Sequence, residues 1–218
     1  MIAVVDYGMG NLRSMAKAIE HVGGEPVLTS DEADIREAER IVLPGVGAFG
    51  EAMENLRSTR LIDVLEDEVL RRGKPFLGVC LGMQLLARSS MEHGRHDGLG
   101  WIAADVLPLA ITAPEIRVPH TGWNDIELCA AAGTPLERVR PREAFYFNHS
   151  LHVVPDDEAI IAAQTWHGER VVAAIARDNV CATQFHPEKS QQAGLELLAD
   201  FVDWQPAYAR QAIRTSTP

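Results

Sequence analysis

An apolar run that leads into Gly-x-Cys-x-Gly and then into a helical pattern is the feature that most narrows the folds open to this chain. Residues 76–84 read FLGVCLGMQ. This is the layout of a nucleophile elbow, in which a strand turns sharply into a helix and lifts the residue at the turn off the sheet. Gly78 and Gly82 leave room for that turn. We expect Cys80 at a helix N-terminus, where the dipole favours a thiolate.

Strand-like and helical patterns alternate around this motif. Residues 1–5, 26–28, 40–43 and 74–79 predict strands, and residues 11–22 and 56–72 predict helices. Short strands are predicted from 101 onwards, at 101–107, 126–128, 144–147, 152–154, 160–165, 171–177 and 180–185, before a closing helix over 191–204. The alternation favours an α/β fold with an open, mostly parallel twisted sheet, helices on both faces and an antiparallel extension.

The chain has 218 residues, of which 46% are hydrophobic, and we expect one domain over 1–204 followed by a frayed tail over 205–218. Its net charge of −11 disfavours nucleic acid or an anionic membrane as the main partner, because phosphate binding needs clustered Lys and Arg. We expect no signal peptide, and no apolar run reaches the ~18 residues that a membrane span needs.

The three cysteines show no paired spacing, so neither a disulfide framework nor a zinc site is expected. We expect Cys129 and Cys181 to be buried apolar residues. An odd cysteine count that includes a thiolate fits a reducing cytoplasm.

A base for Cys80 is predicted in the segment TQFHPEKS, residues 183–190. In an extended chain, His186 and Glu188 project to the same side, and Pro187 favours that geometry for His186. A carboxylate beside the imidazole can set its tautomer and stabilise its charged form. Taken alone, the segment could equally be a surface turn, but the elbow makes a catalytic pair the better interpretation.

Two backbone N–H groups are candidate oxyanion donors. One belongs to Leu81, directly after the nucleophile. The other belongs to Val46 in the segment Pro-Gly-Val-Gly, 44–47, which follows the predicted strand 40–43. In open α/β sheets ligands bind at this carboxyl edge. The glycines around Val46 allow that peptide to turn over.

Seven segments together resemble the class I, or triad, glutamine amidotransferases, and among them the glutaminase subunits of imidazole glycerol phosphate synthase. The resemblance runs from Val5 to about Leu198 and rests on DYGMGNLRS (6–14), LPGVGAF (43–49), GVCLGMQ (78–84), GLG (98–100), VPHTGWN (118–124), YFNHS (146–150) and QFHPEKS (184–190). It implies a flavodoxin-like core. It also implies hydrolysis of L-glutamine through a Cys80-His186-Glu188 triad, without a metal or organic cofactor.

Further site residues follow from the same resemblance. Gly47, Gln84, His149 and Ser150 would bind glutamine, the last two mainly through their backbone. Two positions depart from the family pattern, which usually has a small apolar residue in place of Asn148 and a tyrosine in place of Leu151. His93 and His96 lie in a glycine-rich polar segment that we interpret as a solvated loop rather than a metal site.

The resemblance also implies a partner, a separate (β/α)₈-barrel cyclase that receives ammonia and makes imidazole glycerol phosphate in histidine biosynthesis. The candidate residues for that interface are Asn11, Arg13, Trp123, Tyr146 and Lys189. Activity without the partner should be low, since the Val46 peptide would first have to turn. Three alternatives stay open: a free-standing cysteine hydrolase, a non-catalytic binding subunit, and a glutaminase that serves another pathway such as sugar amidation.

Overall fold

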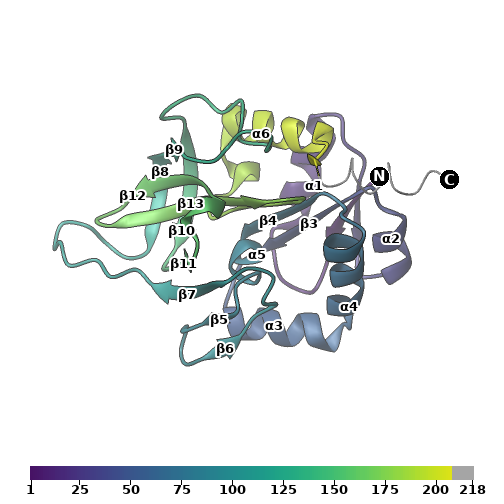
Figure 1. Cartoon of the computed structure of the whole chain (residues 1–218), viewed down its shortest axis with the longest axis horizontal. Helices are drawn as coiled ribbons and strands as arrows, with labels where there is room; N and C mark the ends of the chain where they lie inside the picture. The colour runs from purple at the N-terminus through teal and green to yellow at the C-terminus, as the bar shows by residue number, and fades with distance from the viewer. Residues whose placement is uncertain (208–218) are drawn as a thin grey trace.

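The computed structural model describes residues 1–207, and its centre is one eight-stranded sheet (Figure 1). Five of its strands are parallel and stand in the order β2 (Pro26–Thr29), β1 (Ile2–Val5), β3 (Arg40–Gly45), β4 (Phe76–Cys80) and β14 (Val180–Thr183). This is the order of flavodoxin-like sheets. The predicted open, mostly parallel sheet is therefore confirmed.

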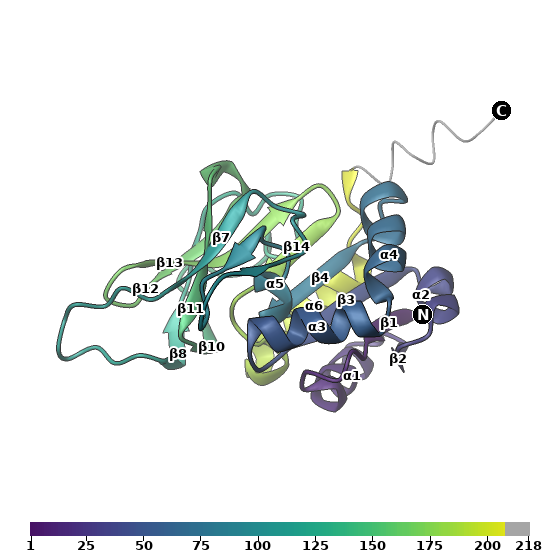
Figure 2. The same ribbon diagram turned by 90° about the horizontal axis from the view of Figure 1, so that it is seen from below.

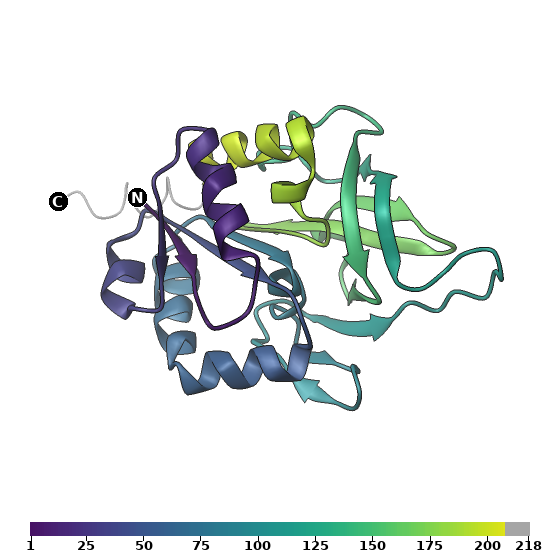
Figure 3. The same cartoon turned by 180° about the vertical axis from the view of Figure 1, so that it is seen from behind.

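Helices cover both faces of the parallel strands. Successive side chains of each strand point to opposite faces of the sheet, and both sets are apolar. Val5, Ile41 and Leu43 belong to one core cluster, and Val4 and Val42 belong to the other. On one face lie α1 (Leu12–His21) and α6 (Gln191–Asp203), which pack together (Figure 3), and on the other α2 (Glu32–Glu37), α3 (Phe49–Ser58) and α4 (Leu61–Glu66). Strands buried on both faces read as continuous apolar runs.

The antiparallel extension projects away from the helix-covered part of the molecule (Figure 2). In the large sheet it consists of β13 (Arg170–Arg177), β12 (Ile161–Trp166) and β9 (Glu127–Leu128). Two smaller sheets stand beside it. One pairs β10 (Ala144–His149) with β8 (His120–Asp125), and the other has the order β11 (Leu151–Pro155), β7 (Ala104–Pro108), β5 (Ser89–Ser90) and β6 (His96–Asp97).

The predicted helix over 56–72 is helical for most of its length but is not one element. The helix that contains Leu56 begins earlier, at Phe49, and ends at Ser58. There the Ser58 and Thr59 hydroxyls bond back to the Asn55 carbonyl. Such bonds compete with helical ones. Arg60 then has a left-handed backbone, with φ of 59°. Helix α4 starts next and continues into a π-helical turn over Asp67–Arg71.

Smaller differences concern elements that the sequence patterns missed. Helix α2 and strand β8 were not predicted, and β7 begins at Ala104 rather than at 101. His96 lies in β6 and closes a short antiparallel pair with β5, so the segment 93–98 is not wholly a solvated loop. Two short 3-10 turns cover Glu158–Ile160 and Pro187–Lys189. The predicted tail over 205–218 lies, from 208 on, outside the described residues.

Candidate active site

Cys80 ends β4 and opens α5 (Leu81–Gln84), with φ of 55° and ψ of −108°. Such angles are strained for a residue with a side chain and are typical of functional turns. A Cβ at Gly82 would collide with the Leu43 carbonyl oxygen, and one at Gly78 would lie 2.9 Å from the Gly82 oxygen. The elbow predicted from Gly-x-Cys-x-Gly is confirmed, since only glycine fits at both flanks.

Our expectation of a helix dipole behind Cys80 needs correction. Helix α5 has only four residues, and so few aligned peptides supply little of a macrodipole. The polar groups that face the sulfur are side chains. The His186 imidazole lies beside it, and the Gln184 Nε2 lies 3.7 Å from Sγ. These two side chains, rather than a helix dipole, are therefore the polar groups that can stabilise charge on the sulfur.

His186 has the extended backbone that the following proline predicts, with φ of −100° and ψ of 98°. Its Nδ1 lies 2.9 Å from the Glu188 Oε1, and each of the two side chains is 2% exposed. Burial alone would lower the pKa of His186, but the bonds to Cys80 and Glu188 outweigh it and raise this pKa to about 9. Both partners therefore favour the charged form of the imidazole beside the sulfur.

A cavity of about 260 Å³ opens over Cys80. It brings together most of the predicted site residues from the parallel sheet and from the antiparallel extension. Its lining consists of Val46, Gly47, Cys80, Leu81, Gln84, Glu92, Pro119, Asn148, His149, Ser150, Leu151 and His186. Glu188 lies behind His186 and does not line the cavity.

The residues of the two predicted oxyanion donors, Leu81 and Val46, both line this cavity. Leu81 is the first residue of α5, so its N–H has no partner within that helix. Gly45 stands opposite Cys80 in the ladder between β3 and β4, and Val46 follows it directly. Gly47 has φ of 116°, a backbone conformation that other residues rarely adopt. The Val46 peptide is thus flanked by residues that permit it to turn.

Both ring nitrogens of His149 are occupied. Nδ1 lies 2.8 Å from the Leu151 carbonyl oxygen, to which it must donate, and Nε2 lies 2.9 Å from the His120 Nδ1. Asn124 donates in turn to the other nitrogen of His120. His149 has no nitrogen left to act as a base, which excludes a serine-hydrolase role for the neighbouring Ser150.

Two side chains of this site, the half-buried Glu92 and the buried Gln184, escaped the sequence analysis. Glu92 lines the cavity, and its carboxylate also accepts the Phe49 N–H at the start of α3. Gln184, fully buried, bonds to Gln84 as well as to Cys80. Glu92 lies in the loop before β6, where no sequence pattern marks it as a site residue. The only signal for Gln184 was its position two residues before His186 in the chain. Cys129, predicted as buried, is exposed, whereas Cys181 is buried.

Three of the predicted partner residues form one aromatic and cationic cluster. The rings of Trp123 and Tyr146 are 6.2 Å apart and nearly perpendicular, and the Lys189 Nζ lies 5.9 Å from the Tyr146 ring centre. Trp123 is half-exposed. Asn11 directly precedes α1 without a side-chain capping bond, and Arg13 is exposed on that helix, which packs against the Pro187–Lys189 turn. All five residues therefore lie on elements that meet near His186.

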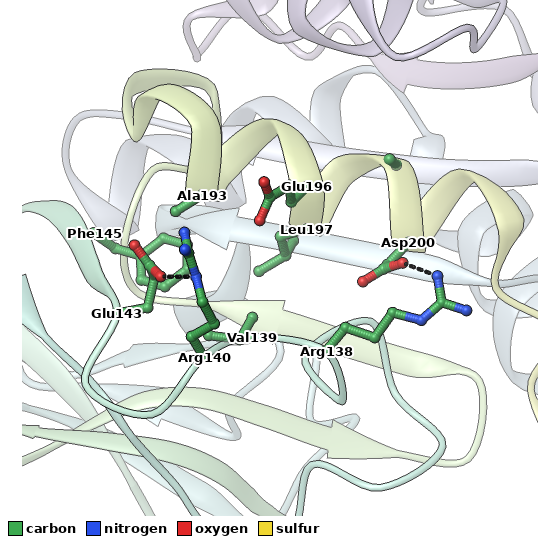
Figure 4. Close-up of a pocket in the computed structure, with 10 residues that line it drawn as sticks. Arg138, Val139, Arg140, Glu143, Phe145, Ala193, Glu196, Leu197 and Asp200 are labelled. Atoms are coloured by element: carbon green, nitrogen blue, oxygen red, sulfur yellow. Dashed lines mark hydrogen bonds and ion pairs between the residues drawn. The ribbon is translucent and has the colours of Figure 1, made fainter.

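A second cavity, of about 250 Å³, lies between α6 and the segment before β10 (Figure 4). Ion pairs close its rim, with Arg138 3.1 Å from Asp200 and Arg140 2.8 Å from Glu143. It contains none of the predicted site residues. Within residues 1–207, no cluster of three or more His, Cys, Asp or Glu side chains is arranged to hold a metal ion. None of the helices in that range has the length and apolar character that a bilayer span requires.

Comparison with known proteins gives consistent relatives. Residues 3–204 match the family model "Glutamine amidotransferase class-I". The chain is 48% identical over 209 residues to "Imidazole glycerol phosphate synthase subunit HisH" of Zymomonas mobilis, with 94% of this chain and 96% of the relative covered. The protein of the same name in Aquifex aeolicus is 48% identical over 199 residues, with 91% and 94% covered.

Solved structures share the fold at low sequence identity. A putative GMP synthase protein from Thermoplasma acidophilum has a TM-score of 0.69 at 19% identity, covering 99% of this chain and 97% of that one. The structure of PurLQS from Thermotoga maritima has a TM-score of 0.70 at 20% identity, with 93% and 97% covered. At such identities the likeness is one of fold alone.

Proposed function

This chain belongs to the class I glutamine amidotransferases and, within them, to the HisH subunits of imidazole glycerol phosphate synthase, and from that premise we propose a complete reaction. In this reaction the protein hydrolyses L-glutamine to glutamate and ammonia through Cys80, His186 and Glu188. The observation that carries the proposal is an imidazole, held by a buried carboxylate, beside a strained cysteine at the floor of a cavity.

The first step is attack of the Cys80 sulfur on the side-chain amide carbon of glutamine. A thiolate is the reactive form, and the charged His186 beside it stabilises that form. As the carbon–nitrogen bond breaks, His186 gives its proton to the departing ammonia and a γ-glutamyl thioester remains. Glu188 holds the ring by Nδ1, so that the other nitrogen faces the reacting atoms.

The negative charge that develops on the amide oxygen needs donors placed in advance. The N–H of Leu81 supplies one, and the N–H of Val46 supplies the second once its peptide has turned. Losing one such donor typically costs about 10² to 10³ in rate. Water then attacks the thioester, with neutral His186 as the base, and releases glutamate.

The zwitterionic end of glutamine also finds partners in the cavity. Glu92 is the carboxylate of the lining and suits the α-ammonium group. Both amide hydrogens of Gln84 are used within the protein, on the Leu151 carbonyl and the Gln184 Oε1. Only the Gln84 oxygen is left for substrate, and it is an acceptor for the same ammonium group. Gly47 and the backbone of His149 and Ser150 complete the pocket.

A partner subunit receives the ammonia. We propose that it is the (β/α)₈-barrel cyclase of histidine biosynthesis, and that it docks over the cluster of Trp123, Tyr146 and Lys189, with Asn11 and Arg13 at its edge. Half-exposed aromatic residues beside a cation are typical of interface anchors. Docking turns the Val46 peptide and activates the enzyme. The free cysteines support the reducing cytoplasm as its compartment.

The test is glutamate release from L-glutamine by the purified chain, alone and with the cyclase and its nucleotide substrate. We expect a low rate that rises by orders of magnitude with both, and a fall of at least about 10⁴-fold in Cys80→Ala. Cys129→Ala, which removes an exposed thiol far from the cavity, is the matched control and should keep full activity. Cleavage of γ-glutamyl peptides with no action on glutamine would instead indicate a free-standing hydrolase.

A further inference from the structure

Two buried glutamine side chains join the nucleophile to the wall of the cavity. Gln84 is the last residue of α5, and Gln184 directly follows β14, which pairs with the strand that carries Cys80. The Gln84 Nε2 lies 3.0 Å from the Leu151 carbonyl oxygen and 3.0 Å from the Gln184 Oε1. The Gln184 Nε2 lies 3.7 Å from the Cys80 Sγ. These contacts form a continuous chain from the cavity wall to the sulfur.

Hydrogen-bond chemistry fixes which way each amide points. The Leu151 carbonyl can only accept, so the Gln84 atom that faces it must be the nitrogen. The same nitrogen faces Gln184, whose facing atom must therefore be its oxygen. The remaining end of Gln184 is its NH₂ group, and one of its hydrogens is directed at the Cys80 sulfur. The donor is thus aimed at the sulfur by its neighbours rather than by its own rotamer.

We propose that Gln184 is a positioning residue for Cys80, and the inference rests on the proposed role of Cys80 as nucleophile. Its N–H holds the sulfur in the direction of the cavity and favours the thiolate, because a donor bonds to a charged acceptor more strongly than to a neutral one. Gln184 is fully buried, so water does not compete for the bond. Gln84 and the Leu151 carbonyl lock the donor in place.

The same carbonyl has a second donor, the Nδ1 of His149, 2.8 Å away. One oxygen therefore receives both the chain that ends at Cys80 and the chain that runs through His149 to His120. A change in the position of Leu151 alters the donor of Gln84 and hence the orientation of Gln184. The nucleophile and the substrate-binding wall are coupled at this atom.

The experiment measures the rate of Cys80 alkylation by iodoacetamide across pH, in a Cys129→Ala background so that one accessible thiol remains. In Gln184→Leu we expect the pH midpoint of alkylation to rise and the rate at pH 7 to fall about tenfold, the low end for a bond to a charged group. The kcat for glutamine should fall by a similar factor, and KM should rise as well, because Gln184 also orients the substrate-binding Gln84. In Gln184→Glu, a carboxylate against the sulfur should raise the midpoint further.

Thr183→Val is the matched control. Thr183 is the buried last residue of β14, directly before Gln184, and its hydroxyl bonds to the Phe185 carbonyl rather than to Cys80. It should lower the melting temperature without moving the alkylation midpoint. If Gln184→Leu and Gln184→Glu lose melting temperature but keep the wild-type midpoint, Gln184 is structural only and the proposal is overturned. Because alkylation needs no glutamine, its outcome is independent of whether the proposed glutaminase activity is found.

Discussion

Two groups of buried histidines in this molecule have opposite proton affinities. His186 is 2% exposed, whereas His120 and His149 are 3% and 6% exposed. Burial lowers the proton affinity of all three. Yet the pKa of His186 is raised to about 9, whereas burial and neighbouring imidazoles lower that of His120 to about 4 and that of His149 to about 3.

The difference lies in the partners. His186 faces a carboxylate and a thiol, which both favour the charged ring. His120 and His149 face each other, an amide and a carbonyl, and His120 stacks on Phe147 and His167. Burial therefore does not decide whether a histidine acts as an acid. An opposite charge within hydrogen-bond reach outweighs the cost of desolvation, whereas neutral partners leave a ring that only donates and accepts fixed hydrogen bonds.

The strongest way to break the contrast is Glu188→Gln. It keeps the shape but removes the charge, so the pKa of His186 should fall and the preferred tautomer should change. We expect kcat to fall about 10³- to 10⁴-fold, as for carboxylates that orient a catalytic histidine. Steady-state glutaminase assays measure this, and an NMR titration of the His186 ring follows its pKa. Glu196→Gln on the exposed side of α6 is the control. Activity within tenfold of wild type would contradict the triad.

The two groups of histidines should make opposite contributions to the pH dependence of the free energy of unfolding. A histidine with a lowered pKa stabilises the fold fully above its unfolded value of about 6.5 and loses this contribution as pH falls from there toward its folded pKa. His120→Gln should therefore flatten the loss of stability between pH 6.5 and about 4. At pH 7 it should lose about 1–3 kcal/mol, because His149 and Asn124 lose their partner. Urea unfolding at a series of pH values measures both effects.

His186→Gln is the counterpart in the same experiment. The raised pKa of His186 stabilises the fold fully below about 6.5, and this contribution is lost as pH rises toward about 9. The variant should therefore lose this contribution below about pH 6.5, keep the slope of the acid side of the stability curve, and flatten the alkaline side. If either variant changed the slope of the stability curve equally on its acid and alkaline sides, the two groups of histidines would not differ as described.

The smallest effect is expected for His167→Phe. The His167 ring stacks on His120 at 4.0 Å, and its charge adds to the lowering of the His120 pKa that burial begins. Phenylalanine keeps the stacking but cannot carry charge, so the pKa of His120 should rise slightly and glutaminase activity should stay within about twofold. NMR titration of His120 measures the shift. If the pKa of His120 returned to the ordinary histidine value, the charge of His167, rather than burial, would be the main cause of its lowering.

Features that depend on neighbours in the chain were predictable. The elbow follows from Gly78 and Gly82, and the pairing of His186 with Glu188 follows from an extended His-Pro-Glu segment. The parallel strands are apolar on both faces and were found to within about two residues. The helix over 56–72 failed because its apolar spacing continues through a turn that Ser58, Thr59 and Arg60 impose.

Features that depend on tertiary placement could not be predicted. Nothing in the segment around Glu92 indicates that this carboxylate reaches the cavity, since the loop before β6 must first fold against α3. The role of Gln184 needs Gln84, 100 residues away in the chain, to orient it. His120 and His149 are likewise joined across 29 residues by the pairing of β8 with β10.

The crowding at Gly82 has a consequence for anyone who would redesign this pocket. Because the Leu43 carbonyl oxygen occupies the space of a Cβ at position 82, a saturation library there should return glycine alone, whatever the substrate under selection. The opposite wall is built from the antiparallel extension, where Asn148 and Ser150 are exposed. Useful diversity therefore belongs at those positions, with the strand and elbow that carry the sulfur left untouched.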